Sequence, residues 1–259
     1  MSDTILLKKE SSIATITLNR SKVFNSFNRE MALAMQSALD DCKNDEEVRC
    51  IVIVGDGKAF CAGQDLAEVS GPENPGFQSI LAEHYNPIVT RIREIPKPVI
   101  AAVNGVAAGA GANIALCCDI VVAAESASFI QAFSKIGLIP DSGGTYVLPR
   151  LIGFQKASAL MMLGEKVSAP DAENMGMIYK VFSDETFSQE VFALASTLAQ
   201  MPTYGIGLTK KALHLAMTNS FEQQLQLEES LQIKAGRSAD YKEGVASFME
   251  KRKPNFKGK

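Results

Sequence analysis

The sequence predicts an α/β fold with mostly parallel strands. Three short and nearly continuous apolar runs, at 49–57, 97–105 and 119–125, have the pattern of strands that are covered on both faces. Helical stretches fall between these runs, and strands that alternate with helices are typical of a parallel sheet. The chain has 259 residues, 46% of them hydrophobic, so it is long enough to bury a full core.

The other elements are predicted from the same kinds of pattern. Residues 13–20 alternate in polarity and predict a strand, whereas residues 28–45 have apolar positions at helical spacing and predict an amphipathic helix. Residues 66–80 contain two prolines and two glycines, which indicates a mobile loop before the next helix. From about Phe187 onward the pattern is all-helical, and one helix, over 238–252, is expected to begin at a serine cap.

Composition excludes several classes of protein. The formal net charge is -3 and the acids and bases are mixed along the chain, which argues against a nucleic-acid groove. Apolar runs stay shorter than the ~18 residues of a membrane span, so we expect no membrane partner. The first residues do not combine a basic end with a long apolar stretch, so we expect a cytoplasmic protein rather than a secreted one.

Cysteine and histidine usage narrows the chemistry. The five cysteines are odd in number, and their spacing fits neither a zinc site nor a disulfide framework, so we expect reduced core residues. They are Cys42, Cys50, Cys61, Cys117 and Cys118. The only histidines are His84 and His214, so Ser-His, Cys-His and histidine-rich metal chemistry lack support, and we expect no metal site.

Three glycine-rich turns follow strand-like runs, at 58–66, 104–119 and 139–146. None matches a dinucleotide fingerprint or a phosphate-binding loop. In the second turn, small residues at 109–112 open an apolar helix, whose first amides lack partners and lie at the positive end of the dipole. With an amide near Gln64 they would form an oxyanion hole. The alternative is that small residues only allow close packing of the helix on a strand.

Asp141 stands in the third turn, between the apolar "LIP" and the glycine-rich "SGG". Burial there would raise the pKa of its carboxyl group and make it a better base than an exposed aspartate. The alternative is that Asp141 caps the helix that follows.

These motifs together resemble the enoyl-CoA hydratase/isomerase (crotonase) superfamily over essentially the whole chain. The matching stretches are 60–66, 97–129, 137–153 and 235–256. The resemblance implies a crotonase-like core of repeated ββα units over 1–186 and a helical C-terminal region for trimerisation over 187–259. It also implies an acyl-CoA thioester substrate, with coenzyme A as part of the substrate rather than a separate cofactor, and a homo-oligomer that is a trimer or a dimer of trimers.

The resemblance also implies roles for individual residues. The oxyanion hole of the superfamily corresponds to the backbone N–H groups of Gln64 and Ala110. Further positions implied in binding substrate or coenzyme A are Ala62, Gly63, Asp65, Gly109, Gly111, Asn113 and Lys251. For Asp65 we expect local bonds that hold the oxyanion loop. Asn113 would bond either substrate or bound water, or else a helix backbone group. Lys251 would contact the phosphates of coenzyme A, often in a neighbouring subunit, or would be solvated.

Two departures from the superfamily pattern decide the expected reaction. Hydratases of the superfamily activate water with two glutamates, and the corresponding positions here are Asn113 and Phe133. Neither side chain can take a proton from water at neutral pH. Asp141 is the remaining acid, which resembles the isomerases of the superfamily, in particular those that act on ring-1,2-epoxyphenylacetyl-CoA in phenylacetate degradation.

Asp141 would then shuttle a proton through an enolate held by Gln64 and Ala110. The alternatives are an enoyl-CoA hydratase that uses Asp141 alone, a Δ3,Δ2-enoyl-CoA isomerase of β-oxidation, and a binding scaffold without catalysis. Tyr85 and Phe77 flank the 66–80 segment and would line either the acyl pocket or the core.

Overall fold

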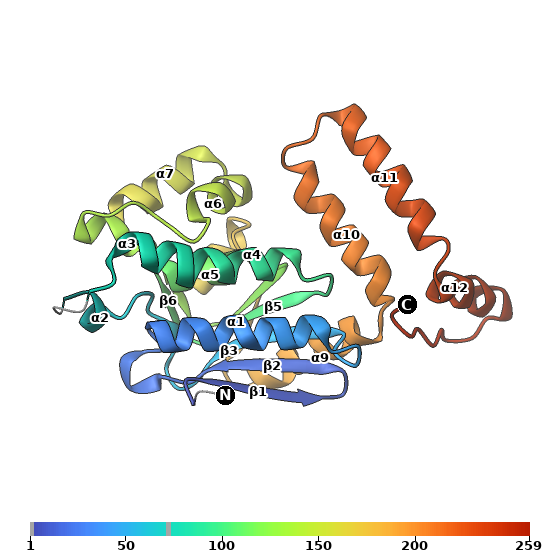
Figure 1. The fold of residues 1–259 in the computed structure, drawn as a ribbon, viewed down its shortest axis with the longest axis horizontal. Coiled ribbons are helices and arrows are strands. Elements are labelled where there is room, and N and C mark those ends of the chain that lie inside the picture. The colour runs from blue at the N-terminus through green and yellow to red at the C-terminus, as the bar shows by residue number, and fades with distance from the viewer. Residues whose placement is uncertain (1–2, 71–73) are drawn as a thin grey trace.

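Two β-sheets organise the N-terminal part of the chain (Figure 1). The computed structural model describes residues 3–70 and 74–259. Within these residues the larger sheet has the order β1 (Ile5–Glu10), β2 (Ile13–Leu18), β3 (Cys50–Gly55), β5 (Val99–Val103), β7 (Ile120–Ala124) and β10 (Lys180–Phe182). All neighbours in it are parallel except β1 and β2. The smaller sheet has the order β4 (Ala59–Cys61), β6 (Val106–Ala108), β8 (Ser128–Ile130) and β9 (Lys166–Ser168).

Successive strands enter the two sheets in turn. The chain runs from β3 to β4, from β5 to β6 and α5 (Ala110–Leu116), and from β7 to β8, so each passage gives one strand to each sheet. This is the predicted crotonase-like α/β fold with repeated ββα units. The strands predicted at 13–20, 49–57, 97–105 and 119–125 are confirmed as β2, β3, β5 and β7.

Apolar burial explains the larger sheet and the helices beside it. Every residue of β5 is buried, as are most residues of β3. The predicted amphipathic helix is α1 (Arg29–Asn44), which begins where the Asn28 side chain accepts a bond from the Met31 amide at 3.0 Å. Helix α1 packs against β1, β2 and α4 (Asn86–Glu94).

The prediction of a loop over 66–80 is wrong for most of that segment. Leu66–Ser70 forms the short helix α2, and Gly76–Ser79 forms α3, while 71–73 lie outside the described residues. Pro75 stands at the N-cap of α3, with φ -70°, a position that proline tolerates. This proline therefore marks the N-terminal boundary of a helix, and its presence in the segment does not exclude helical structure.

A π-helical segment, η2 (Ile80–Tyr85), connects α3 to α4. The Asn86 amide donates to the Leu81 carbonyl, five residues back. Pro87 in the next turn has no N–H to offer the Glu83 carbonyl, which instead accepts from the Gln36 side chain at 2.7 Å. The widened turn changes which side chains of this segment point inward, and Tyr85 is one that is almost fully buried.

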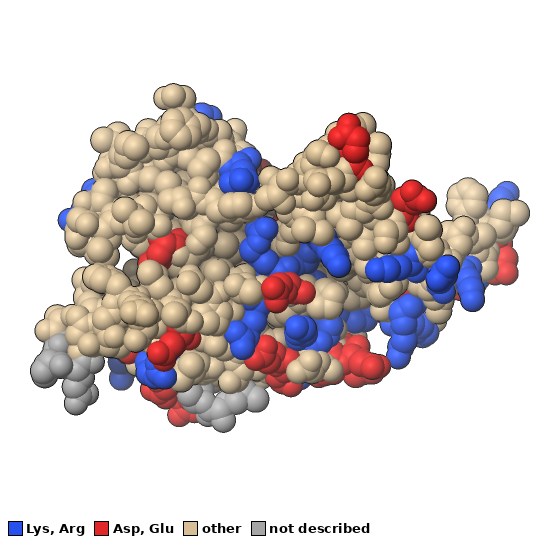
Figure 2. Space-filling view, turned by 45° about the horizontal axis from the view of Figure 1, so that its top comes forward, with Lys and Arg blue, Asp and Glu red and all other residues tan. Residues whose placement is uncertain are grey.

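Shorter elements complete the core region. They are η1 (Ser21–Val23), η3 (Ala132–Ile136), α6 (Gly144–Ile152), α7 (Phe154–Leu163) and α8 (Ala169–Asn174). Figure 2 shows few charged side chains over α6 and α7, whereas Lys, Arg, Asp and Glu lie next to one another from the centre to the lower right of that face. This mixture agrees with the charge distribution in the sequence.

The chain after Phe187 is helical, as predicted, up to its last residues. Helix α9 (Phe187–Gln200) packs on β2, β3 and β7, whereas α10 (Thr203–Ala216), α11 (Phe221–Ala235) and α12 (Ala239–Glu250) extend to one side (Figure 1). The predicted serine cap is Ser238, which accepts from the Tyr241 amide at 3.0 Å. A division into a core over 1–186 and an oligomerisation region over 187–259 stays a prediction.

The five cysteines lie in the core, as predicted, and their thiols are free. Among the helices of the described residues, none has the length and apolar character required to cross a membrane.

Candidate active site

A cavity of about 410 Å³ brings most of the predicted site residues together. Its walls come from the turn after β4, from α2, α3 and η2, from the turn before α5, from η3 and from the turn before α6. Most of the lining is apolar, with contributions from Leu66, Val69, Phe77, Ile80, Leu81, Phe133 and Leu138. Among the described residues that line it, Asp141 is the one carboxylate.

The turn before α5 presents the first backbone donor. Gly109 has φ 54° and ψ -126°, a conformation that is open to glycine and closed to other residues. A Cβ there would meet only the Phe133 ring, at 3.8 Å, so backbone conformation rather than space requires glycine. Ala110 is the first residue of α5, where the helix offers its N–H no acceptor. Both residues line the cavity.

The turn after β4 presents the second donor. The Gly63 carbonyl accepts from the Phe27 amide at 2.7 Å, and the Asp65 amide donates to the Phe27 carbonyl at 2.8 Å. Because C=O and N–H point in opposite directions across a trans peptide, the bond to Phe27 turns the Gln64 N–H away from Phe27. A Cβ on Gly63 would lie 3.4 Å from the Ala110 nitrogen, so the two turns lie side by side. Ala62, Gly63 and Gln64 line the cavity.

The alternative reading of the small residues, close packing, applies to Gly111. A Cβ at Gly111 would lie 2.4 Å from the Cys61 carbonyl oxygen and 2.7 Å from its sulfur. Gly111 is buried and lies outside the cavity lining. Both readings of this turn are therefore realised, at different residues: Gly109 and Ala110 face the cavity, and Gly111 lets α5 approach β4.

Side chains around Gln64 hold it at both ends of its amide. The Tyr85 hydroxyl donates to Gln64 Oε1 at 2.9 Å, and Gln64 Nε2 donates to Glu68 Oε2 at 2.7 Å. Tyr85 is 1% exposed, and burial raises its pKa well above the ordinary value, so it is a neutral donor at pH 7. Tyr85 and Phe77 both line the cavity.

Asp65 lies just outside the cavity lining. Its carboxylate accepts from Arg20 Nη2 at 2.9 Å and from the Ala67 amide at 3.1 Å. These bonds tie the Gln64 turn to Arg20 and to the start of α2, which is the local holding role expected for Asp65.

The turn that carries Asp141 is not the helix cap considered above. The N-cap of α6 is Gly143, and the Asp141 carboxylate instead accepts from the Ser142 hydroxyl at 2.8 Å. Ser142 and Gly143 have φ 51° and 77°, so two consecutive left-handed residues follow the aspartate. Burial raises the pKa of Asp141, and the Ser142 hydroxyl opposes that rise only in part. Asp141 enters no ion pair within the described part of the chain.

Asn113 is fully buried and does not line the cavity. Its Nδ2 donates to the Asp141 carbonyl oxygen at 2.9 Å, and its Oδ1 accepts from Gln131 Nε2 at 2.8 Å. The Asn113 side chain thus bonds a backbone group, as the second reading expected, but one in the turn before α6 rather than in a helix. Gln131, the partner of Asn113, and Glu68, the partner of Gln64, were not predicted from the sequence, because no sequence motif indicates these pairs.

Lys251 is far from this cavity. It is the C-cap residue of α12, with φ 55°, and α12 lies at the opposite end of the molecule from α2 and α3 (Figure 1). A contact between Lys251 and coenzyme A bound at this cavity therefore requires a second copy of the chain.

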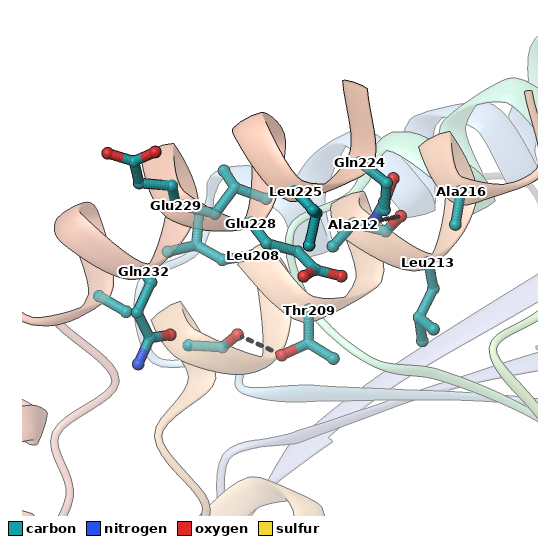
Figure 3. A pocket seen from close by; sticks show the side chains of 13 residues that line it. Leu208, Thr209, Ala212, Leu213, Ala216, Gln224, Leu225, Glu228, Glu229 and Gln232 are labelled. Atoms are coloured by element: carbon teal, nitrogen blue, oxygen red, sulfur yellow. Dashed lines mark hydrogen bonds between the residues drawn. The ribbon is translucent and has the colours of Figure 1, made fainter. Parts of the chain in front are cut away.

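A larger groove, about 680 Å³, lies between α10 and α11 (Figure 3). Leucine and alanine side chains line much of it, Glu228 and Glu229 supply its acids, and the Thr209 hydroxyl donates back to the Gly205 carbonyl at 3.0 Å. It contains none of the predicted site residues. Size alone thus does not identify the site, whereas the convergence of two turns and Asp141 does.

Comparisons with known proteins show the family of the chain. Residues 8–259 match the family profile described as "Enoyl-CoA hydratase/isomerase". The chain is 49% identical to the 1,2-epoxyphenylacetyl-CoA isomerase of Escherichia coli, over 100% of both chains. It is 43% identical to a Rhodobacter capsulatus protein named "Probable enoyl-CoA hydratase", over 99% of this chain and 98% of the relative. A crystal structure of an enoyl-CoA hydratase from Bacillus anthracis superimposes with a TM-score of 0.95 at 31% identity, covering 99% of this chain and 100% of the other.

Proposed function

Because the chain belongs to the enoyl-CoA hydratase/isomerase family, we propose that it is an acyl-CoA isomerase whose acid–base group is Asp141. The observation that carries this proposal is the lone carboxylate in the lining of an apolar cavity, beside two turns with free backbone N–H groups. Coenzyme A enters as part of the substrate, and the proposal includes no separate cofactor and no metal.

The first step is proton removal from the carbon next to the thioester carbonyl. Asp141 takes the proton, and the electron pair moves onto the carbonyl oxygen to form an enolate. A raised pKa brings the strength of this base closer to neutral pH. Lys135 also lines the cavity, but within the described residues the Asp141 carboxylate enters no ion pair, so it stays available to a proton.

The enolate oxygen lies between the N–H groups of Gln64 and Ala110. Donors of this kind typically account for about 2.7–4 kcal/mol of barrier each, so they supply a large share of the catalysis. Asp141 then returns the proton elsewhere along the conjugated system, so the atoms and charge of the substrate are conserved. The product is an isomer.

For the substrate we propose ring-1,2-epoxyphenylacetyl-CoA. It would rearrange to the seven-membered oxepin-CoA as the C–C bond shared by the epoxide and the six-membered ring breaks and its electron pair enters the conjugated system. Two observations support this choice over a linear chain. The relative of 49% identity carries the name of that isomerase, and the cavity is walled by Phe77, Phe133 and aliphatic side chains that suit a ring.

The second candidate, hydration of an enoyl-CoA, is favoured by the relatives named as hydratases. Against it stand the residues at the positions of the two hydratase glutamates. Phe133 forms part of the cavity wall, and both ends of the Asn113 amide are bonded to protein groups. A linear Δ3,Δ2 isomerisation needs the same parts as the ring reaction and stays the closest alternative.

We also propose that copies of the chain assemble as a trimer or a dimer of trimers through residues 187–259. Several large apolar side chains of α10–α12 are exposed in a single copy, among them Leu213, Phe221, Phe248 and Met249. Large apolar side chains that are exposed in this number on one region of a chain are typical of an interface. Light scattering behind size exclusion measures the assembly directly.

Product analysis tests the reaction. The protein is incubated separately with ring-epoxidised phenylacetyl-CoA, a linear 3-enoyl-CoA and crotonyl-CoA, and the products are separated by mass and retention time. We expect an isomer from the first substrate at the highest kcat/KM. Faster turnover of the linear 3-enoyl-CoA would reassign the substrate, and a 3-hydroxyacyl product from crotonyl-CoA would favour hydration.

A further inference from the structure

The turn that carries Asp141 is held to helix α5 by two side chains. Asn113 Nδ2 donates to the Asp141 carbonyl oxygen at 2.9 Å, and the Cys117 thiol lies 3.4 Å from the Ser142 carbonyl oxygen. The same Asp141 oxygen also accepts from the Gly144 amide at 2.9 Å. Besides the Ser142 hydroxyl, which bonds to the carboxylate, Asn113 is therefore the side chain that ties the Asp141 backbone to α5.

The orientation of the Asn113 amide is fixed by its surroundings. A carbonyl oxygen can only accept, so the NH2 group of Asn113 must face Asp141 and its oxygen must face Gln131. Gln131 Nε2 donates to that oxygen at 2.8 Å, and Gln131 itself is 2% exposed. The Gln131 Oε1 atom is buried without a hydrogen-bond partner among the described residues. The bond between Gln131 and Asn113 is therefore accompanied by the desolvation cost of one unpaired acceptor.

The turn needs such a restraint, because its backbone is strained. Ser142 is 1% exposed and has φ 51°, a conformation that residues with a side chain rarely adopt. Gly144 fits so closely against Asn113 that a Cβ at position 144 would lie 2.3 Å from Asn113 Nδ2. Strained residues persist where the surrounding structure holds them, and here the contact of Asn113 with residues 141 and 144 does so.

We propose that Asn113 is a positioning residue for Asp141: its bond to the Asp141 carbonyl keeps the strained turn against α5, so that the carboxylate faces the cavity. This inference rests on the proposed function of Asp141 and adds a role that is distinct from binding substrate. Gln131 completes it by bonding the far end of the Asn113 amide.

The test measures deuterium incorporation at the α-carbon of phenylacetyl-CoA in D2O, over a range of pH, with the full-length protein. We expect Asn113→Ala to lower the exchange rate by about 10- to 100-fold, the scale that small misplacements of reacting groups produce. We also expect the acid limb of its pH profile to move to lower pH, because a loosened turn lets water reach the carboxylate. A KM within about threefold of the wild-type value would show that substrate binding is intact.

Asn104→Ala is the matched control. Like Asn113, Asn104 bonds protein groups at both ends of its amide. Its Nδ2 donates to the Gly57 carbonyl at 3.0 Å, and its Oδ1 accepts from the Gly55 amide at 2.9 Å. Asn104 lies outside the cavity lining. We expect it to lower Tm without moving the acid limb. A wild-type rate and acid limb in Asn113→Ala would overturn the proposal.

Two further variants remove the remaining ambiguities. If Asn113→Ala does not fold, the double variant Asn113→Leu/Gln131→Leu replaces it, because it removes both amides together and leaves neither unpaired. A lowered exchange rate in the double variant supports the proposal, and a wild-type exchange rate overturns it. Asp141→Asn separates this inference from the proposed function. Exchange at the wild-type rate in Asp141→Asn would contradict the function itself, whereas loss there with normal exchange in Asn113→Ala would contradict only the role of Asn113.

Discussion

Asp141 and Asp119 are two aspartates whose pKa is raised by burial, yet their surroundings differ. The Asp119 carboxylate pairs with Lys210 at 2.8 Å and accepts from the Val99 amide at 2.8 Å. Nearby His214 has its pKa lowered to about 4 by burial, so Lys210 is the cation that balances the charge at pH 7. The Asp141 carboxylate instead accepts from the Ser142 hydroxyl and from its own backbone amide, and it faces a cavity.

The difference shows that burial alone does not indicate a base. The Lys210 ammonium also donates to the carbonyls of Ile92 at 2.7 Å and Lys97 at 3.2 Å, so Asp119 belongs to a network that joins α10 to the core. A carboxylate in such a network is structural. Asp141 forms no ion pair in the part of the chain that the structure describes and has room for a substrate beside it, so it is suited to proton transfer. Substitutions at the two aspartates and in the turns beside Asp141 test this difference.

The largest effect is expected from Asp141→Asn. The amide cannot accept the substrate proton, so we expect isomerase turnover to fall by about 10²- to 10⁴-fold, the usual contribution of a positioned acid–base group. The measurement is kcat with ring-epoxidised phenylacetyl-CoA, with circular dichroism to confirm the fold. Near-normal turnover would remove Asp141 from the mechanism.

The same variant also has a predicted effect on stability. Because the folded-state pKa of Asp141 is raised, the native protein binds more protons than the unfolded chain between the ordinary and the raised pKa. The charged carboxylate therefore costs stability as pH rises through that window, and the cost is full above it. At pH 7 we expect Asp141→Asn to melt at or above the wild-type Tm, and a lower Tm would contradict this.

The next effect is expected at Gly109, with Gly111 as the contrast. Gly109→Ala has space but not the backbone conformation, so it should shift the Ala110 N–H and lower kcat by about 10²- to 10³-fold, as loss of an oxyanion donor does. Gly111→Ala meets the Cys61 backbone and should reduce Tm instead. If both variants lost kcat in the same proportion to their loss of Tm, the kcat loss in Gly109→Ala would reflect destabilisation, and the turn would have no catalytic role.

Asp119→Asn should act on stability rather than on chemistry. Removal of the charge leaves the Lys210 ammonium buried without its carboxylate, which typically costs about 3 kcal/mol or more. We expect urea denaturation to show that loss, while the folded variant retains a kcat within about twofold of the wild type. A turnover loss as large as that of Asp141→Asn would make the two aspartates equivalent.

The smallest effect is expected from Tyr85→Phe. It removes one hydrogen bond to Gln64 and keeps the ring, so a loss of about 1 kcal/mol, or roughly fivefold in kcat, is expected. Tyr179→Phe, on an exposed tyrosine outside the cavity lining, is the control and should leave kcat unchanged. Wild-type kcat in Tyr85→Phe would show that the other bonds of the Gln64 turn, to Phe27, Arg20 and Glu68, hold it without Tyr85.

The larger sheet and the main helices could be predicted because their patterns are long enough to read. Strands β3, β5 and β7 are each five or six residues with almost continuous burial. The smaller sheet was missed because β4, β6, β8 and β9 have three residues each, too few for a period to appear. The prediction of a loop over 66–80 was wrong because proline and glycine, which favour loops, can also stand at the ends of short helices, as Pro75 and Gly76 do here.

Within the site, the residues in family motifs could be predicted and their supports could not. Gln64, Ala110 and Asp141 were predicted together and line one cavity. The bonds from Asn113 to Asp141 and from Tyr85 to Gln64 join residues that are 28 and 21 positions apart, and no local pattern specifies such pairs. Whether Asp141 caps a helix depends on the left-handed backbone of Ser142, which a serine in the sequence does not indicate.

The most direct test of the account follows deuterium incorporation from D2O into the α-carbon of phenylacetyl-CoA by the wild-type protein and by Asp141→Asn. The account predicts exchange by the wild type that falls as pH drops through the raised pKa of Asp141, and exchange by the variant that is lower by about 10²-fold or more at every pH. Exchange by Asp141→Asn at the wild-type rate, with the same dependence on pH, would contradict it.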